Sequence, residues 1–236
     1  MENSTRNSMM MPAALVIAAG LIAAAIIFKG GTTAPTVATV PTQAQQPTAI
    51  AVDITKIKAD GEPFVGKIDA PVTVALWADY QCPFCKRFDQ DAVKQLMTDY
   101  VNTGKVKLVF KDFSFLGADS DTAGLASRAV WEAAPDKFAQ WHEAMYGKQD
   151  TENGGWGNKD DILALTKSLG IDATKVAQLM TDKATEYQKL MDADKAEGSA
   201  NGINGTPGTI IGKQLLSGAQ PYSAVKQLVE AELQKK

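Results

Sequence analysis

Residues 72–85 read VTVALWADYQCPFC, and this stretch decides the fold. Its first six residues, VTVALW, are rich in β-branched side chains. Apolar residues occur at both odd and even positions, as expected for a strand buried on both faces. Cys82 and Cys85 follow shortly after that strand with the spacing C-x-x-C. The stretch therefore predicts a buried strand that leads into a cysteine pair.

The segment after the cysteines predicts a helix and then a second strand. Residues 106–110 (VKLVF) have the composition of a strand. Between the two strands, apolar residues recur at every fourth position, as they do on one face of an amphipathic helix. They are Phe84, Phe88, Ala92, Leu96 and Tyr100. A strand, a helix and a strand in this order form a βαβ unit, in which the two strands pair in parallel.

The remainder of the chain predicts several helices and then a hairpin. Residues 120–200 contain no convincing strand, and their apolar spacing with polar caps is typical of helices. Residues 209–211 and 215–216 flank Gly212-Lys213, a pair suited to a two-residue hairpin turn. An amphipathic helix ends the chain. The predicted architecture is βαβ, a block of inserted helices, and ββα.

Composition restricts the chemistry to the two cysteines. The chain has 236 residues and a net charge of −3, without a basic block, which argues against nucleic acid as a partner. Two cysteines are too few for a disulfide scaffold or a tetrathiolate zinc site. A single histidine leaves little room for a histidine-based metal site or catalytic triad. We therefore expect neither a metal nor an organic cofactor.

The N-terminal segment predicts a membrane anchor followed by a tether. Residues 9–28 (MMMPAALVIAAGLIAAAIIF) carry no charge and would span about 30 Å as a helix, the thickness of a bilayer core. We interpret residues 1–29 as a transmembrane anchor; the alternative is a signal sequence, removed near Gln43-Ala44. Residues 30–51 are rich in Thr, Pro, Ala and Gln and predict a flexible tether. A globular domain over 52–236 follows.

The position of the cysteine pair predicts a redox site. Cys82 would lie at the N-terminus of the first helix, where free backbone N–H groups and the helix dipole lower a thiol pKa. Pro83 suits the first helical turn because it has no N–H to leave unpaired. Cys85 would lie one turn further on, within reach of a disulfide to Cys82. The alternatives are a structural disulfide, half of a zinc site, or two unreactive thiols.

A second candidate element is the loop Asn204-Gly205-Thr206-Pro207-Gly208, just before the hairpin. If the ββα half packs against the βαβ half, this loop comes to lie beside Cys82. A cis Thr206-Pro207 bond would turn the backbone groups of Thr206 toward an incoming extended peptide. The sequence does not fix the cis or trans state, and an ordinary turn is the alternative.

Four segments, in order along the chain, resemble the DsbA-like thiol:disulfide oxidoreductases, in particular the membrane-anchored bacterial members. They are WADYQCPFC (77–85), VFKDF (109–113), the pairs Lys137-Phe138 and Trp141-His142, and NGTP (204–207) followed by GAQPY (218–222). The resemblance implies an α/β thioredoxin-like fold with an all-helical insertion at about residues 117–200. It also implies a catalytic domain on the periplasmic or extracellular face of the cell membrane, held by a single-pass anchor.

The resemblance also assigns roles to residues. It implies Cys82 as the nucleophile, Cys85 as the resolving cysteine and Pro207 as the cis-proline. Thr206, together with Pro83 and Phe84 between the cysteines, is the candidate substrate-binding set. The implied partners are substrate proteins with free thiols and a quinone-linked membrane oxidase of the DsbB or vitamin-K-epoxide-reductase type.

The sequence departs from this family pattern at two places. Many relatives carry a buried acid six residues before the first cysteine, where this chain has Leu76. Proton transfer at Cys85 would then use Lys111, Asp79 or water. The Pro-Phe dipeptide also lacks the histidine of the strongest oxidants. His142 is interpreted as a packed or capping residue.

The predicted function is oxidation of dithiols in substrate proteins to disulfides. Cys82 is expected to be exposed and Cys85 to be shielded. The nearest alternative is the same site used as a reductase or isomerase. A thiol-based metal-binding or chaperone module is a further alternative from another functional class.

Overall fold

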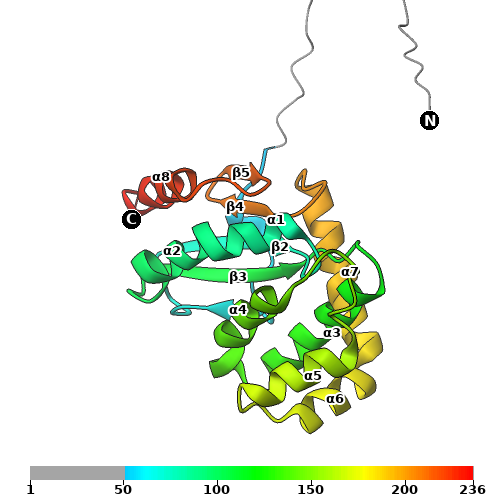
Figure 1. Cartoon of the computed structure of the whole chain (residues 1–236). Coiled ribbons are helices and arrows are strands. Elements are labelled where there is room, and N and C mark those ends of the chain that lie inside the picture. Colours follow the sequence, from blue (N-terminus) through cyan, green and yellow to red (C-terminus); the bar gives the residue numbers. More distant parts are fainter. Residues whose placement is uncertain (1–50, 236) are drawn as a thin grey trace, which may run out of the picture. The chain divides into compact units, whose positions relative to one another are not determined.

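The computed structural model describes residues 51–235, and the five strands in that range form one mixed sheet in the order β1-β3-β2-β4-β5 (Figure 1). The central strands β2 (Val72–Ala78) and β3 (Val106–Asp112) pair in parallel, as the βαβ pattern predicts. Strands β4 (Gly208–Ile211) and β5 (Gln214–Ser217) form the predicted hairpin, which joins β2 in antiparallel orientation.

Strand β1 (Phe64–Val65) is absent from the sequence prediction. It pairs antiparallel with β3, with Phe64 opposite Val109. A strand of two residues has no measurable alternation, so periodicity cannot reveal it. It covers one edge of β3 near the start of the described residues.

The helix after the cysteines runs over residues 83–101 and contains two π-type segments. It comprises α1 (Pro83–Phe88), the π-type η2 (Asp89–Val93), α2 (Lys94–Leu96) and the π-type η3 (Met97–Val101). An apolar repeat of four residues would drift around a regular helix of 3.6 residues per turn. The wider π turns keep the repeat on one face.

Four of the five residues in that repeat are buried as predicted, and the first is not. Phe88, Ala92, Leu96 and Tyr100 are each at most 4% exposed, whereas Phe84 is 53% exposed. The prediction that Phe84 belongs to the buried stripe was therefore wrong. Phe84 lies in the first turn of α1, between two buried cysteines, with its own side chain at the surface.

Helices fill the chain between β3 and β4. Their bounds are α3 (Ala118–Ala133), α4 (Phe138–Lys148), α5 (Lys159–Ser168), α6 (Ala173–Asp182) and α7 (Ala184–Ala200), with the short 3₁₀ turn η4 (Pro135–Lys137) before α4. Side chains of Asn158 and Asp172 cap α5 and α6 by accepting backbone N–H groups. Figure 1 shows α3, α5 and α6 grouped together, away from the C-terminal α8 (Tyr222–Leu233).

The two faces of the sheet carry different hydrophobic clusters. Leu76 and Phe110, which are paired in register, belong to the larger cluster with α1, α4 and α8. Trp77 lies on the opposite face and packs with Ile203 and Ile210. Gly198 of α7 approaches Trp77 so closely that a Cβ there would lie 2.8 Å from the indole ring. This glycine allows α7 to pack directly on the sheet.

The predicted anchor over residues 1–29 and the signal-sequence alternative lie outside the described residues, and so does the predicted tether over 30–51 except for its last residue. Among residues 51–235, none of the helices combines the length and the apolar character needed to cross a bilayer. A short 3₁₀ turn, η1 (Ile54–Lys56), begins the described part of the chain, and the Asp53 side chain caps it.

Candidate active site

The two cysteines lie at the start of the helix that follows β2. Cys82 is the N-cap residue of α1 and Pro83 occupies the first helical turn, as the sequence predicts. The Cys82 carbonyl accepts backbone N–H groups from Cys85 at 3.0 Å and Lys86 at 3.1 Å. The backbone N–H groups of Cys85 and Phe84 also interact with the Cys82 sulfur.

Hydrogen bonds to sulfur lower the pKa of Cys82 to about 6. The largest cause is the thiol of Cys85, which donates to the Cys82 sulfur. Burial opposes the shift, and the contact with Thr206 and the backbone N–H groups of Cys85 and Phe84 reinforce it. At neutral pH Cys82 is therefore mostly a thiolate, the form that reacts in exchange.

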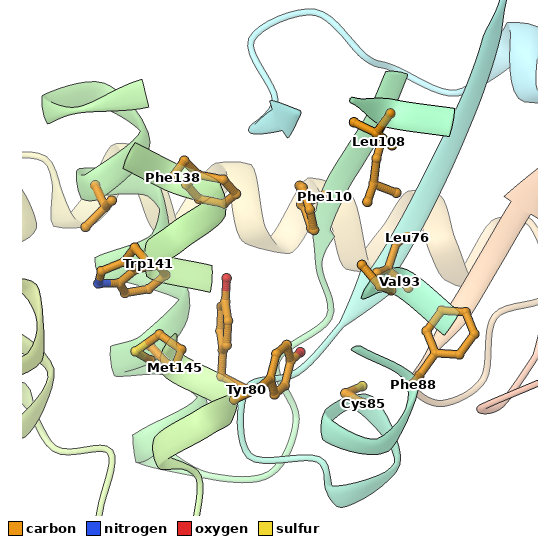
Figure 2. Packing of buried hydrophobic residues seen from close by; sticks show 14 of the residues in the cluster. Leu76, Tyr80, Cys85, Phe88, Val93, Leu108, Phe110, Phe138, Trp141 and Met145 are labelled. Carbon is orange, nitrogen blue, oxygen red and sulfur yellow. The ribbon is translucent and has the colours of Figure 1, made fainter. Parts of the chain in front are cut away.

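Cys85 has the opposite character. Burial raises its pKa well above the ordinary value, and the neighbouring Cys82 sulfur raises it further. Figure 2 shows Cys85 within the same hydrophobic cluster as Leu76 and Phe88. Cys85 therefore keeps its proton and donates it to Cys82, so the two sulfurs are chemically unequal.

The loop before β4 lies against the cysteine pair, as expected from packing the two halves together. The Thr206-Pro207 peptide bond is cis, and the Cys82 Sγ donates to the Thr206 carbonyl over 3.5 Å when it is protonated. This loop covers the sulfur, so Cys82 is only 3% exposed. The expectation of an exposed Cys82 was therefore wrong.

Pro83 and Phe84, in contrast, are both exposed. The Arg87 guanidinium lies over the Phe84 ring, 5.1 Å from its centroid. The structure thus brings Pro83 and Phe84 to the surface beside Cys82 and places Thr206, with its cis bond to Pro207, at the Cys82 sulfur.

Asp79 lies close to the cysteines, but its carboxylate is already engaged. It accepts the Gln81 N–H at 2.8 Å, the Ser120 hydroxyl at 2.6 Å and the Phe115 N–H at 3.0 Å. Its backbone carbonyl accepts the Cys82 N–H at 3.1 Å. Asp79 therefore ties the loop before Cys82 to the start of α3.

The structure does not bring Lys111 to the cysteines. Lys111 is opposite Trp77 in the β2–β3 register, on the sheet face away from Leu76 and Cys85. Leu76 itself faces the cluster that contains Cys85, so an apolar side chain occupies the place of the family's buried acid. Lys111 and Asp79 thus differ sharply as candidates for proton transfer.

Lys111 belongs instead to a buried set of charged residues that we call the ion cluster. Its members are Glu62, Lys111, Asp112, Arg128, Asp194 and Glu197. Arg128 contacts Glu62 at 2.5 Å, Asp112 at 2.6 Å, and also Asp194. Among residues 51–235, no group of three or more His, Cys, Asp or Glu side chains is arranged to hold a metal ion.

Sequence reasoning missed Gln149, which supports the segment leading to Cys82. Its Nε2 donates to the carbonyls of Tyr80 at 2.6 Å and Cys82 at 3.1 Å. Its own carbonyl accepts the Lys86 ammonium at 2.5 Å. Gln149 follows α4, 64 residues after Cys85, and no spacing or composition signal points from one to the other.

His142 is buried on α4, in agreement with its interpretation as a packed residue, and it contacts Tyr80 and Asp89. It lies within the larger hydrophobic cluster, with its ring centroid 4.4 Å from that of Phe110. None of these contacts involves the sulfur of Cys82 or Cys85.

Comparison with known proteins agrees with the fold and with the dithiol. A family model described as thioredoxin matches residues 58–231. Disulfide bond formation protein D of Bacillus subtilis is 32% identical over 176 residues, which cover 75% of this chain and 79% of that protein.

Solved structures give the same result. The chain resembles the crystal structure of oxidised BdbD from Bacillus subtilis, with a TM-score of 0.70 and 33% identity, covering 79% of this chain and 98% of that one. It also resembles the thiol-disulfide exchange protein alpha-DsbA2 from Wolbachia pipientis, with a TM-score of 0.64 and 26% identity, over 72% and 86% of the two chains. The chain therefore belongs to the DsbA-like thiol:disulfide oxidoreductases of the thioredoxin family.

Proposed function

We propose that this enzyme works as an oxidase that introduces disulfides into substrate proteins. The observation that carries the proposal is the stabilised thiolate of Cys82, whose pKa is about 6. A stabilised thiolate lowers the free energy of the reduced enzyme, which makes its disulfide a better oxidant. The name of the Bacillus subtilis relative, a disulfide bond formation protein, supports the same direction.

The proposed reaction has two exchange steps. A substrate thiolate attacks the Cys82 sulfur of the Cys82–Cys85 disulfide; a mixed disulfide forms, and Cys85 leaves and takes up a proton. A second substrate thiolate then attacks the substrate sulfur of the mixed disulfide and releases Cys82 as a thiolate. Two substrate thiols supply two protons: Cys85 keeps one and the other passes to solvent. The substrate loses two electrons, and the enzyme gains them as its dithiol.

The residues around the dithiol have proposed roles in binding the substrate. Thr206 and Pro207 would hold an extended substrate segment against Cys82, and Pro83 and Phe84 would contact its side chains. For the proton that Cys85 takes up, we prefer Asp79 or water to Lys111. The sheet lies between Lys111 and Cys85, whereas Asp79 belongs to the loop that leads into the cysteine pair.

We propose an extracytoplasmic location with a single-pass anchor. The uncharged run 9–28 supports an anchor within residues 1–29, followed by a tether over 30–51 and the catalytic domain over 52–236. Helices between about 117 and 200 form the insertion. An enzyme of this kind needs an electron acceptor, and we propose a quinone-linked membrane oxidase of the DsbB or vitamin-K-epoxide-reductase type.

The direction of exchange can be tested by equilibrating the full-length protein with glutathione. We expect a potential clearly more oxidising than that of thioredoxin, which is about −270 mV. The oxidised protein should also convert a reduced two-cysteine substrate to its disulfide form. A potential at or below that of thioredoxin would exclude the oxidase and favour the reductase alternative.

A further inference from the structure

His142 is the only histidine of the chain, and the exchange reaction described above assigns it no part. Its Nδ1 lies 2.8 Å from the Tyr80 hydroxyl, and its Nε2 lies 3.1 Å from Oδ1 of Asp89. Tyr80 precedes Cys82 by two residues, and Asp89 follows Cys85 by four. One side chain of α4 therefore contacts the chain on both sides of the dithiol.

The partners of His142 determine where its protons lie. A carboxylate only accepts hydrogen bonds, so Asp89 favours a proton on Nε2. The contact between Nε2 and Asp89 lacks the geometry of a hydrogen bond. Nε2 has no hydrogen-bond acceptor elsewhere in residues 51–235. In the neutral ring Nδ1 is then the acceptor, and the Tyr80 hydroxyl donates to it.

A second proton on His142 would reverse this hydrogen bond. Both ring nitrogens of the charged imidazole are donors, so the Tyr80 oxygen would have to accept from Nδ1. The Tyr80 proton would then turn to Oγ of Ser127, which lies 3.5 Å away. The chain Ser127–Tyr80–His142–Asp89 therefore has two hydrogen-bonded states that differ by one proton.

Charged groups surround this chain from several elements. Burial raises the pKa of the Tyr80 hydroxyl, and the charges of Asp112 and Asp89 raise it further, whereas the Ser127 hydrogen bond and the charge of Arg128 lower it. The Tyr146 ring packs edge-on against His142, with 5.1 Å between the centroids. A cavity of about 640 Å³ borders His142 and Asp89, and its lining also includes Lys94 and Glu143. Water in this cavity would give the proton a route to His142.

Helix α4 also holds the main chain that leads to Cys82. The Tyr80 ring packs against Trp141, with 5.5 Å between the centroids, and Figure 2 shows both side chains. It also packs against Tyr146, with centroids 5.1 Å apart. As described above, Gln149 binds the Tyr80 and Cys82 carbonyls from the end of the same helix. These contacts hold residues 80–82 in place. A change in the hydrogen bond of the Tyr80 hydroxyl is therefore transmitted along this segment to Cys82.

We propose that His142 is a positioning residue for the exchange reaction: it fixes the segment before Cys82 through Tyr80 and couples the reactivity of Cys82 to its own protonation. This inference concerns the dithiol in either direction of exchange. It therefore stands or falls separately from the oxidase proposal.

The first test measures Cys82 alkylation in the reduced protein across a range of pH. His142→Phe keeps a ring in place but removes both polar contacts, and we expect alkylation at neutral pH to slow about tenfold, the effect of one hydrogen bond. The wild-type profile should show two titration steps and the His142→Phe profile only one. His142→Asn, whose amide can reach the Tyr80 hydroxyl, should recover most of the rate without the second step.

Thr166→Val is the matched control. It removes the hydrogen bond of 3.0 Å between Trp141 Nε1 and the Thr166 hydroxyl, which is as deeply buried and also involves α4. We expect this variant to lose stability but to keep the wild-type pH profile. If Thr166→Val slows alkylation as much as His142→Phe, the role of His142 is structural and the proposal is wrong.

A second measurement needs no variant. With labelled histidine, the wild-type protein gives a single imidazole signal in NMR, because it has one histidine. If His142 affects Cys82, the redox state of Cys82 must affect His142 by the same free energy. The midpoint of the His142 titration should therefore differ between the oxidised and reduced protein. Identical titrations would overturn the coupling.

Discussion

The dithiol and the ion cluster stabilise buried charge in opposite ways. At the dithiol, the Cys82 thiolate is stabilised by neutral groups: chiefly the Cys85 thiol, then the Thr206 side chain and backbone N–H groups. In the ion cluster, opposite charges face one another against a strong penalty of burial. The carboxylates of Asp194, Glu62 and Glu197 outweigh burial at Lys111 and raise the pKa of its ammonium, whereas burial prevails at Asp194 and raises the pKa of that carboxyl to about 7. One site stabilises a single anion with neutral donors, and the other places several cations and carboxyl groups against one another.

This difference follows from what each region has to do. A thiolate paired with a buried cation would be stabilised too strongly to be lost and regained within one exchange cycle. Neutral donors lower the pKa of Cys82 only to about 6, close to working pH. The ion cluster has no such constraint, and its contacts connect α3 and α7 to β3 and to the segment before β1.

The largest expected effect comes from removing one sulfur of the pair. Cys82→Ser should abolish exchange, because the stabilised thiolate is lost and Cys85 holds its proton. Cys85→Ser should leave Cys82 able to attack but unable to resolve, so mixed disulfides with substrate accumulate. Non-reducing gels of both variants after incubation with a disulfide-containing substrate measure this difference. Equal trapping by the two variants would contradict the unequal roles of the sulfurs.

Arg128→Met should have the next largest effect, on stability rather than on chemistry. It leaves Glu62, Asp112 and Asp194 without their shared cation, and breaking a buried ion pair costs about 3–5 kcal/mol. The Cys82 pKa should hardly change, because no member of the ion cluster is among its main causes. Urea unfolding and the pH dependence of alkylation measure the two quantities.

Lys183→Met provides the control for Arg128→Met. Lys183 pairs with Glu132 at 2.8 Å on the surface, where both side chains are more than a third exposed. Exposed ion pairs contribute about 0–1 kcal/mol. If both variants lose the same stability, the ion cluster does not differ from an ordinary surface pair.

The sequence predicted the dithiol well because its signals are local. The strand at 72–77, the C-x-x-C spacing and the proline after Cys82 are contiguous, so the helix N-terminus and the unequal thiols follow from short-range rules. The hairpin and the parallel pairing of β2 with β3 were predicted for the same reason. Phe84 was misplaced because the repeat shows only the helix face and not how deeply each turn of that face is buried.

The ion cluster could not be predicted from the sequence. Arg128 lies 66 residues after Glu62 and 66 residues before Asp194. Each of the three looks like an ordinary surface charge in its own segment. The same holds for Gln149 and for the contacts of His142. Such groups become neighbours only when α3, α4 and α7 pack against the sheet. Lys111 was a candidate for proton transfer because Leu76 stands where many relatives carry a buried acid, but the register of β3 directs Lys111 to the other face.

A smaller effect is expected from pH on the reduced protein. Folding lowers the Cys82 pKa from its ordinary value to about 6, so the thiolate stabilises the reduced fold fully only above the ordinary pKa. At pH 7 this contribution is about 1.4 kcal/mol, and it is lost as the pH falls through 6. The disulfide instead contributes about 2 kcal/mol through chain entropy at any pH.

The melting curves of the two redox states should therefore converge near neutral pH. The oxidised form should melt higher at pH 5, and the reduced form should melt higher at pH 8. A disulfide form that remains clearly more stable at pH 8 would mean that the thiolate of Cys82 is not stabilised. That result would favour the reductase alternative over the oxidase.

The smallest effect on the dithiol is expected from Lys111→Met, which tests the separation of the two regions directly. Lys111→Met removes one cation of the ion cluster and should destabilise the fold, because Glu62 and Asp194 lose a partner. The pH profile of Cys82 alkylation, and the rate at which Cys85 resolves a mixed disulfide, should nevertheless stay as in the wild type, since the sheet lies between Lys111 and the sulfurs.

Asp79→Asn is the informative comparison, because Asp79 adjoins the dithiol and orders the loop before it. We expect that variant to slow resolution by Cys85 while Lys111→Met does not. If Lys111→Met alone slows resolution, the proton of Cys85 passes through the ion cluster, and the two regions are one functional unit.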